Sequence, residues 1–469
     1  MDKKRNTLTI LVGLLTASFT MAEEPAKKPN IVLIMTDDVG WECFGSYGAD
    51  DYKTPNLDRL AKEGVQFNHC YSTPICTTSR VMIMTGKYNF RNYTHFGYLN
   101  PKEKTFGNMM QEAGYKTAIA GKWQLNGGYN TKDFPDHNDS TRVNKAGFDE
   151  YALWQLTKKV AGERFWSPGL EVNGKALTSE DNANLYGPDI MSDFICDFIE
   201  RNKEEPFFVY YPTVLVHSPF VPTPDSIGDK DRGKGANKTP KDPKARKENF
   251  VAMVNYMDKI VGKIVHKLEE LGELENTLIL FTSDNGTHTL INSQWMGRSI
   301  QGGKAGMKDH GTHVPLIAYW KGQALAGQVR KDLVDFSDFY PTLAELAGVE
   351  LDETDPKDGK SFLPQIKGAE VESRTHALCY YQPYWGGKSK KSIGAYVRTE
   401  RFKLYEDGRF YDIEKDLEEK NDLAGSLNHE LAIESHKLLS KLMKQVPPVP
   451  KGSKSSKERP IHPDWPLIK

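Results

Sequence analysis

Four oxygen-bearing side chains stand at the ends of two apolar segments. Asp37 and Asp38 follow the run PNIVLIMT, and Asp284 and Asn285 follow TLILFTS. If both runs are parallel strands of one sheet, their carboxyl ends meet at one edge and the four side chains converge there. Such an all-oxygen set suits a hard cation, Ca²⁺ or Mg²⁺, and offers no imidazole for zinc. Taken singly, each pair is also typical of an ordinary turn that ends a strand.

A cysteine lies in a setting that is unusual for a packing residue. Cys76 belongs to the segment STPICTTSR, where hydroxyl side chains surround it. We expect a short loop here that opens into a helical stretch from Arg80 to Thr85, ended by Gly86. Free N–H groups at a helix start and the guanidinium of Arg80 favour a bound anion. On these residues alone, Cys76 is a packing residue, a metal ligand or a nucleophile.

Apolar runs and helical patterns alternate along most of the chain. The expected strands are residues 31–35, 115–123, 206–212, 277–283 and 314–320. The expected helices are residues 54–64, 106–115, 188–202, 249–271 and 338–348. This alternation predicts an α/β fold with a large, mostly parallel sheet sandwiched by helices, which we place at residues 29–368. The charged stretch from residue 229 to 249 is expected to be a solvated loop.

The pattern changes after about residue 370. Residues 395–413 alternate around the turn dipeptide Asp407-Gly408, which predicts an antiparallel hairpin, and a helix is expected at residues 430–444. We therefore predict a small C-terminal α+β subdomain that carries an antiparallel sheet, at residues 372–446. The Pro-, Lys- and Ser-rich residues 447–469 are expected to form a loosely ordered tail.

The N-terminus is typical of an exported protein. Lys3, Lys4 and Arg5 precede an apolar run that ends in small residues near Ala22. Residues 1–22 are therefore predicted to be a cleaved signal peptide, and the mature protein to be periplasmic or secreted. An uncleaved membrane anchor is the alternative, although the run is short for a spanning helix. No other segment is expected to enter a membrane stably.

The net charge and the cysteine count limit the possible functions only slightly. The 62 basic and 63 acidic residues give a net charge of −1, so no global field attracts nucleic acid, and no nucleic-acid partner is expected. The five cysteines, at positions 43, 70, 76, 196 and 379, show no disulfide framework. If Cys76 is reserved for chemistry, the other four are either paired or free.

The segment from Cys76 to Gly86 resembles a family signature. CTTSR, then a hydrophobic stretch and Thr85-Gly86, is similar to the sulfatase pattern Cys-x-Pro-x-Arg followed by Leu-Leu-Thr-Gly. Further landmarks stand in family order: MTDD, TPNLDRLAKEGV, GKW at 121–123, VHSPF, SDNG, GGK at 302–304 and VPLI. The resemblance spans roughly residues 29–368, with a family-like RFKLYEDGRFYDIEKD beyond. The chain thus resembles the type I, formylglycine-dependent sulfatases of the alkaline phosphatase superfamily, arylsulfatase A among them.

The resemblance implies a role for each matching position. A formylglycine-generating maturation enzyme would oxidise Cys76 to formylglycine, whose hydrate attacks sulfur and whose aldehyde is regenerated when sulfate leaves. The ligands of one divalent cation, Ca²⁺ or Mg²⁺, would be Asp37, Asp38, the modified residue 76, Asp284 and Asn285. The groups that bind sulfate oxygens would be Arg80, Lys122 and Lys304. His217 would protonate the leaving alcohol. The implied activity is hydrolysis of a sulfate ester, with a sulfated saccharide as the expected substrate.

Two positions depart from the family pattern. Thr78 replaces the signature proline, which favours the extended form that the maturation enzyme reads, so Thr78 is expected to slow the conversion of Cys76. Gln124 replaces the histidine of GKWH that is thought to act as base when sulfate is eliminated, and a glutamine hydrogen-bonds sulfate but takes no proton. As a hypothesis, His288, His310 or His313 supplies this base near the substrate, because all three stand close to Asp284 or Lys304 in sequence.

Two other functions fit parts of the sequence. A phosphatase or phosphodiesterase of the same superfamily would need two zinc ions and more histidine ligands than this motif set provides. A non-catalytic binder of sulfated glycans, with Cys76 never converted, would be consistent with Thr78 and Gln124. The aromatic residues that we considered for stacking on sugar rings are Trp154, Phe165, Trp166, Tyr384 and Trp385.

Overall fold

A computed structural model describes residues 27–228, 237–384, 393–450 and 461–468 of the chain. The predicted signal peptide and Trp385 lie outside the described residues. In the part of the chain that is described, no helix combines the length and the apolar character needed to cross a membrane.

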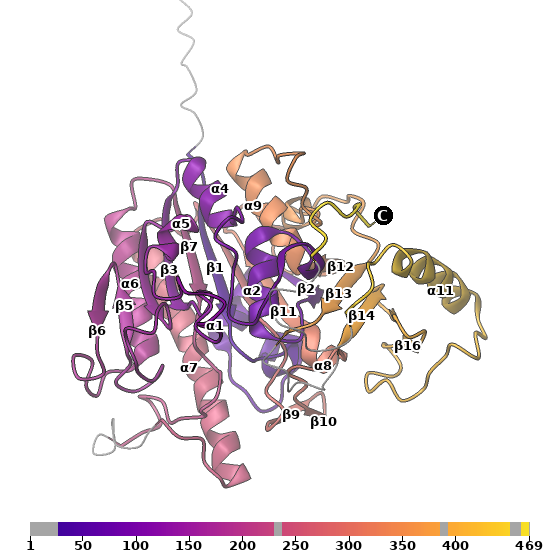
Figure 1. Cartoon of the computed structure of the whole chain (residues 1–469). Coiled ribbons are helices and arrows are strands. Elements are labelled where there is room, and N and C mark those ends of the chain that lie inside the picture. Colours follow the sequence, from indigo (N-terminus) through magenta and orange to yellow (C-terminus); the bar gives the residue numbers. More distant parts are fainter. Residues whose placement is uncertain (1–26, 229–236, 385–392, 451–460, 469) are drawn as a thin grey trace, which may run out of the picture.

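A ten-stranded sheet forms the centre of the molecule (Figure 1). Its strands, in spatial order, are β12 (Gln328–Asp335), β2 (Val65–Tyr71), β11 (His313–Tyr319), β8 (Thr277–Ser283), β1 (Asn30–Thr36), β7 (Phe207–Pro212), β3 (Lys116–Lys122), β4 (Glu150–Trp154), β5 (Leu170–Val172) and β6 (Lys175–Leu177). The strands from β8 to β4 are parallel. β11 runs antiparallel to both of its neighbours, so the sheet is mixed. The predicted α/β class is confirmed.

Helices cover both faces of this sheet. Successive residues of β1 belong to different cores, with Ile31, Leu33 and Met35 in one and Val32 and Ile34 in the other. This is the burial expected of a central strand with helices on both sides. The first core includes side chains of α2 (Cys76–Thr85), α4 (Phe106–Glu112) and α9 (Phe339–Ala347). The second includes side chains of α1 (Pro55–Glu63), α6 (Gly187–Arg201) and α7 (Pro243–Glu270).

One helix corrects a prediction. α7 begins at Pro243, inside the charged stretch that we expected to be a loop, and not at residue 249. Asp242 caps it by accepting a hydrogen bond from the backbone N–H of Ala245, and the proline occupies the first turn. The N-cap and the proline therefore start a helix here, although the charged residues of this segment favour a solvated loop.

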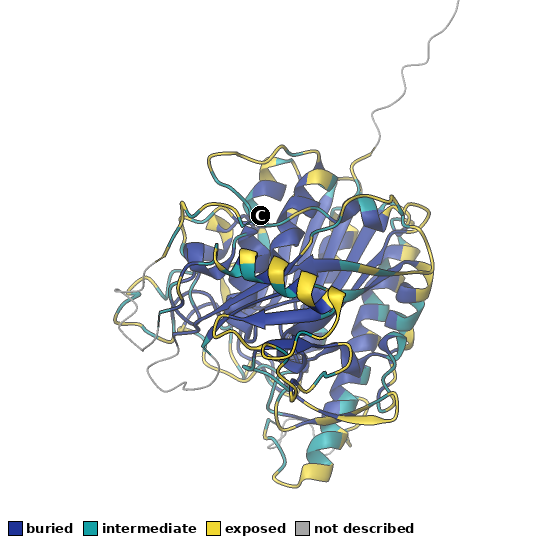
Figure 2. Cartoon of the chain, turned by 90° about the vertical axis from the view of Figure 1, so that its right-hand side faces the viewer, coloured by how far each residue is buried: buried dark blue, intermediate teal, exposed yellow. Residues whose placement is uncertain are grey.

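The predicted hairpin near the C-terminus belongs to a four-stranded antiparallel sheet. Its strands are β13 (Ala377–Tyr381), β14 (Gly394–Arg398), β15 (Phe402–Tyr405) and β16 (Phe410–Asp412), and α11 (Glu430–Met443) packs on it with its outer face exposed (Figure 2). A buried ion pair joins this sheet to the short helical turn that precedes β11. Arg398 Nη1 lies 2.7 and 2.8 Å from the two carboxylate oxygens of Asp309. In the described part of the tail, the carbonyl oxygens of Pro463 and Trp465 accept hydrogen bonds from Arg91.

The remaining elements are short. They are η1 (Trp41–Cys43), η2 (Gly45–Tyr47), α3 (Asn89–Asn92), α5 (Arg142–Lys145), β9 (Asn292–Trp295), β10 (Arg298–Gln301), α8 (Asp309–Thr312), η4 (Phe336–Asp338) and α10 (Leu363–Ile366). β9 and β10 form a separate two-stranded sheet, and Trp295 of β9 also forms an isolated antiparallel bridge with Ala49.

Candidate active site

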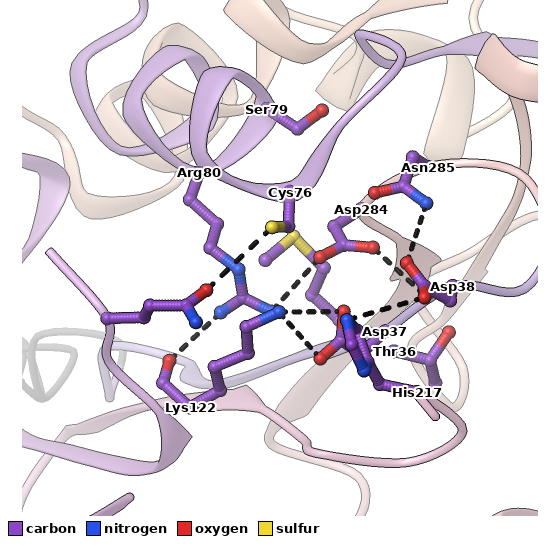
Figure 3. A network of polar contacts seen from close by, with 12 residues as sticks. Thr36, Asp37, Asp38, Cys76, Ser79, Arg80, Lys122, His217, Asp284 and Asn285 are labelled. Atoms are coloured by element: carbon purple, nitrogen blue, oxygen red, sulfur yellow. Dashed lines mark hydrogen bonds and ion pairs between the residues drawn. The ribbon is translucent and has the colours of Figure 1, made fainter. Parts of the chain in front are cut away.

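The carboxyl ends of two adjacent strands bring the acidic residues together (Figure 3). β1 and β8 are parallel and aligned so that Thr36 lies opposite Ser283. The residues that follow each strand are therefore neighbours. The backbone N–H of Asp38 donates to Asp284 Oδ1 at 3.1 Å, and Asn285 Nδ2 donates to Asp38 Oδ1 at 3.0 Å. Asp38 itself has a left-handed backbone with φ 65°, which a non-glycine residue adopts at a cost that is typical of functional sites.

This cluster has the donor chemistry of a cation site. Asp37, Asp38, Asp284 and Asn285 are fully buried. Asn285 Oδ1 is buried without a hydrogen-bond partner, which leaves a free acceptor beside three carboxylates. Ligand atoms of Asp37, Asp38 and His217 lie within 4.8 Å of one another, so His217 borders the same site. The residues present thus fit a hard divalent ion.

The pKa values of the three carboxyl groups differ widely. Burial, with the neighbouring Asp37 as the next contributor, raises the pKa of Asp284 to about 7. Burial acts in the same direction on Asp37, but Lys122 and other cations outweigh it and hold the pKa of Asp37 well below its usual range. For Asp38, burial is likewise outweighed by His217 and Lys304, and its pKa is about 2. Asp284 is therefore the carboxylate that is hardest to keep ionised without a cation.

Cys76 is the first residue of α2 and is only 2% exposed. Its Sγ lies 3.9 Å from Gln124 Oε1. Burial raises the pKa of the Cys76 thiol above its ordinary value, although the Lys122 cation acts in the opposite direction. An unmodified Cys76 is therefore neutral at physiological pH and is a weak nucleophile.

The cationic side chains each contact a carboxylate of the cluster. Arg80 Nη2 lies 3.1 Å from Asp284 Oδ2, and its Nη1 donates to the carbonyl oxygen of Lys122. Lys122 Nζ donates to both oxygens of Asp37 at 2.8 and 3.0 Å. Lys304 Nζ donates to Asp38 Oδ2. Cations and carboxylates thus alternate around one buried volume.

The ring of His217 is oriented by its backbone. Its Nδ1 lies 2.6 Å from the carbonyl oxygen of Ser218, so Nδ1 carries the proton and Nε2 accepts from Lys304 Nζ at 3.0 Å. Burial and the Lys304 cation hold the pKa of His217 well below its ordinary value, although Asp38 opposes them. The imidazole is therefore neutral at rest, and the nearest mobile proton is on the Lys304 ammonium.

The three candidate histidines lie in different surroundings. Burial lowers the pKa of His288, and Asp38 and Lys304 are among the charges that act on it. Its Nδ1 accepts a hydrogen bond from the backbone N–H of Leu290 at 3.1 Å. His310 faces Glu418, with Nε2 3.5 Å from Oε1. His313 stacks on Trp41 with ring centroids 4.4 Å apart and bonds the carbonyl oxygen of Asn68. Of the three, His288 is the one whose pKa responds to the charges of Asp38 and Lys304.

Three residues that the sequence did not single out, Arg164, Gln155 and Tyr129, complete the site around Asp37 and Gln124. Arg164 Nη1 lies 3.8 Å from Asp37 Oδ2. Gln124 Nε2 donates to Gln155 Oε1 at 2.8 Å and to the hydroxyl of Tyr129. These residues come from loops without periodic pattern, so nothing local distinguishes them. The proximity becomes visible only when β3 and β4 are placed side by side.

The aromatic residues considered for sugar stacking are mostly interior. Phe165 and Trp166 are 0% and 2% exposed and pack against Tyr186. Trp154 lies beneath the Arg164 guanidinium, and Tyr384 is also buried. These four rings are therefore packing residues in this conformation. The five cysteines, all within the described residues, are buried and free, which answers the question of pairing that the sequence left open.

The α/β sheet carries an acidic cluster at its carboxyl edge, facing cationic side chains, and the match to the sulfatase family model places such a chain among the hydrolases of the alkaline phosphatase superfamily. A solved phosphonate monoester hydrolase of Agrobacterium radiobacter has this fold, with a TM-score of 0.64 and 20% identity over 88% of this chain and 95% of its own. The sulfatase family model matches residues 29–349, so the chain belongs to the sulfatase family and is a sulfuric ester hydrolase. A second model, described as N-sulphoglucosamine sulphohydrolase, C-terminal, matches residues 303–446.

Similar proteins include sulfatases with named sugar substrates. An N-acetylglucosamine-6-O-sulfatase of Bacteroides thetaiotaomicron is 25% identical over 91% of this chain and 88% of its own length. An N-acetylgalactosamine-6-sulfatase of Canis lupus familiaris is 29% identical over 79% and 72%. The solved structure of Ps i-CgsB in complex with k-i-k-neocarrahexaose has a TM-score of 0.69 and 26% identity, and the match covers 94% of this chain and 95% of that one.

Proposed function

We propose that this protein is an exported sulfatase that hydrolyses a sulfate ester of a carbohydrate, through a formylglycine formed from Cys76 and with one bound divalent cation. The observation that carries the proposal is the position of Cys76. It begins α2 within a ring of carboxylates and cations, yet its raised thiol pKa makes it a weak nucleophile as it stands. Chemistry at this position therefore calls for a modified side chain.

The cation is expected to be Ca²⁺, with Mg²⁺ as the other hard ion that suits oxygen ligands. Asp37, Asp38, Asp284, Asn285 and the modified residue 76 would hold it. When bound, it supplies positive charge that polarises oxygen and offsets the buried carboxylates. The free Asn285 Oδ1 and the raised pKa of Asp284 are the features that support this assignment.

The cationic side chains give the site its preference for an anionic ester. Lys122 is buried and Lys304 is half-buried, and the ammonium group of each has a donor left to share with sulfate oxygens. Arg80 is held by Asp284 and a backbone carbonyl, so it presents a fixed positive charge. Fixed donors in a buried site stabilise charge that develops on the sulfate oxygens as the ester bond breaks.

The leaving alcohol needs a proton, and we assign its delivery to His217. Because Nε2 of His217 accepts from Lys304, the pair shares one proton at the edge of the site. Lys304 passes this proton to Nε2 of His217, and the departing alkoxide then takes it from Nε2, while the Nδ1–H stays on the Ser218 carbonyl oxygen. The imidazole is neutral again after this step, and Lys304 regains a proton from solvent. Of the three histidines proposed to replace the base lost at Gln124, we favour His288 because its pKa responds to the charges of Asp38 and Lys304.

A carbohydrate sulfate is the expected substrate because relatives along most of the chain act on sulfated sugars by name. Export rests on the N-terminal sequence, and conversion requires a formylglycine-generating enzyme as transient partner.

The test is a pair of measurements on protein co-expressed with such an enzyme. Mass spectrometry of the peptide that contains Cys76 should show the lighter formylglycine form. The same preparation should hydrolyse nitrophenyl sulfate much faster than nitrophenyl phosphate, and C76A should be inactive. Faster turnover of the phosphate would favour the phosphatase alternative, and an unconverted, inactive protein that still binds sulfated saccharides would favour the non-catalytic binder.

A further inference from the structure

The guanidinium of Arg164 is the one cation at the site without a hydrogen-bonded carboxylate among the described residues. Its Nη1 is 3.8 Å from Asp37 Oδ2, beyond hydrogen-bond distance, and this atom is buried without a hydrogen-bond partner. Only 11% of the side chain is exposed. An arginine stays charged at any working pH, and a buried charge with unused donors is costly unless a ligand completes it.

Arg164 is held in place by an aromatic ring and by the two residues that follow it in the chain. Its guanidinium carbon lies 3.9 Å from the centre of the Trp154 ring. The next two residues, Phe165 and Trp166, are anchored in the interior, and Trp166 Nε1 donates to the carbonyl oxygen of Pro222 at 2.8 Å. A flat cation fixed on an aromatic face leaves its N–H edges free to bind an anion.

The neighbouring amide network explains why an additional donor is needed here. Gln124 Nε2 is occupied by Gln155 and Tyr129, so the oxygen of the Gln124 amide faces Cys76. Gln124 and Gln155 both have left-handed backbones, with φ 56° and 53°, which fix this orientation. An acceptor oxygen repels sulfate oxygens. The side of the site nearest Gln124 therefore lacks the N–H group that a histidine would provide.

The net charge of the cluster also favours a bound anion. Three carboxylates, Asp37, Asp38 and Asp284, face four cationic side chains, Arg80, Lys122, Lys304 and Arg164. A divalent cation would increase the positive excess further. The anionic sulfate group is the ligand that reduces it.

We propose that Arg164 binds the sulfate group of the substrate and supplies the donor that is absent at Gln124. This inference rests on the proposed sulfatase function. It adds to the machinery a residue from the β4–β5 connection, which lies outside the motifs of the sequence signature. The competing role is purely local, in which Arg164 only balances the charge of Asp37.

The two roles predict different results for R164Q. The probe is inorganic sulfate, measured both as a competitive inhibitor of nitrophenyl sulfate hydrolysis and by calorimetric titration. Loss of one charged hydrogen bond should weaken sulfate binding about 10- to 100-fold in both measurements. R164K, which keeps the charge but not the fork of donors, should show a smaller loss. Ca²⁺ binding by R164Q should be as tight as in the wild type or tighter, because a cation near Asp37 has been removed.

K159Q is the matched control. Lys159 is an exposed cation of the same loop, and its removal should change sulfate binding less than twofold. Sulfate affinity of R164Q within twofold of the wild type would overturn the proposal. If R164Q does not fold, wild-type affinity in R164K overturns it instead. A converted wild type that neither binds sulfate nor cleaves the ester would refute the sulfatase function itself, which is a separate outcome.

Discussion

Asp284 should make the proposed cation binding by this protein depend on pH. Its pKa is about 7 in the ion-free protein, because burial and the adjacent Asp37 disfavour the ionised form. Below pH 7 the carboxyl group is protonated, so a bound Ca²⁺ must displace that proton. Each pH unit below 7 should then weaken Ca²⁺ binding about tenfold, and the affinity should rise about a hundredfold between pH 5 and pH 7 before it levels off.

The other site carboxyl groups do not contribute to this dependence. The pKa of Asp38 is about 2 and that of Asp37 lies lower, so both are ionised throughout the range. D284N should therefore bind Ca²⁺ more weakly and with an affinity that is constant between pH 5 and pH 7. D338N is the matched control, because burial also raises the pKa of Asp338 to about 7 at a position that is not part of the cluster.

Isothermal titration calorimetry measures both the Ca²⁺ affinity and the number of protons released when Ca²⁺ binds. Repeating the titration at pH 6 in buffers of different ionisation enthalpy should reveal about one proton released per Ca²⁺ in the wild type and D338N, and none in D284N. The same raised pKa makes ion-free protein lose stability as pH rises from about 4 to about 7, because the folded state holds the Asp284 proton more tightly than the unfolded state. A wild-type affinity that is flat between pH 5 and pH 7 would refute the assignment of Asp284 as a ligand.

Three further predictions test other parts of the site. T78P should raise the fraction of Cys76 that is converted, seen as more of the lighter Cys76 peptide in mass spectra. T78A is the control, and a converted fraction in T78P no higher than in T78A would contradict the prediction. G121A should destabilise the fold by at least about 2 kcal/mol in chemical denaturation, since a Cβ at this φ of 120° would lie 2.0 Å from the carbonyl oxygen of Pro212. G114A, with φ 85° and open space, should cost less. H288A should lower kcat for nitrophenyl sulfate at least tenfold while H313A changes it little, and equal effects would argue against His288 as the base.

The features predicted well from sequence are those fixed by short segments. Strand β1 and strand β8 are apolar runs that end in polar turns, and both lie where the pattern places them. Gly86 ends α2 with φ 67°, and its N–H donates to the carbonyl oxygen of Met82, as expected for a glycine after a helix. The turn at Asp407-Gly408 separates β15 from β16. Each of these depends on residues within one or two turns of chain.

The features that sequence missed depend on distant contacts. β2 was not predicted, because Val65–Tyr71 includes Gln, Asn and His, and its pairing with β11 and β12 stabilises it. The direction of β11 follows from how the chain returns to the sheet, which no local pattern records. Arg164 stands in a segment without motif, and the Trp154 ring together with the packing of Phe165 and Trp166 against Tyr186 holds it near Asp37.

The burial of Cys76 bears on when its proposed conversion takes place. All ten residues of α2 are buried, and the hydroxyl of Thr78 donates to the carbonyl oxygen of Ile75 within the first turn. A maturation enzyme that needs an extended segment cannot reach this thiol without unfolding the helix from the core. The proposed conversion would therefore precede folding, and Thr78 would act at that stage, where the chain lacks the bias toward extended backbone that proline gives. Fast folding then competes with conversion, so slower folding, for example at lower temperature, should increase the converted fraction.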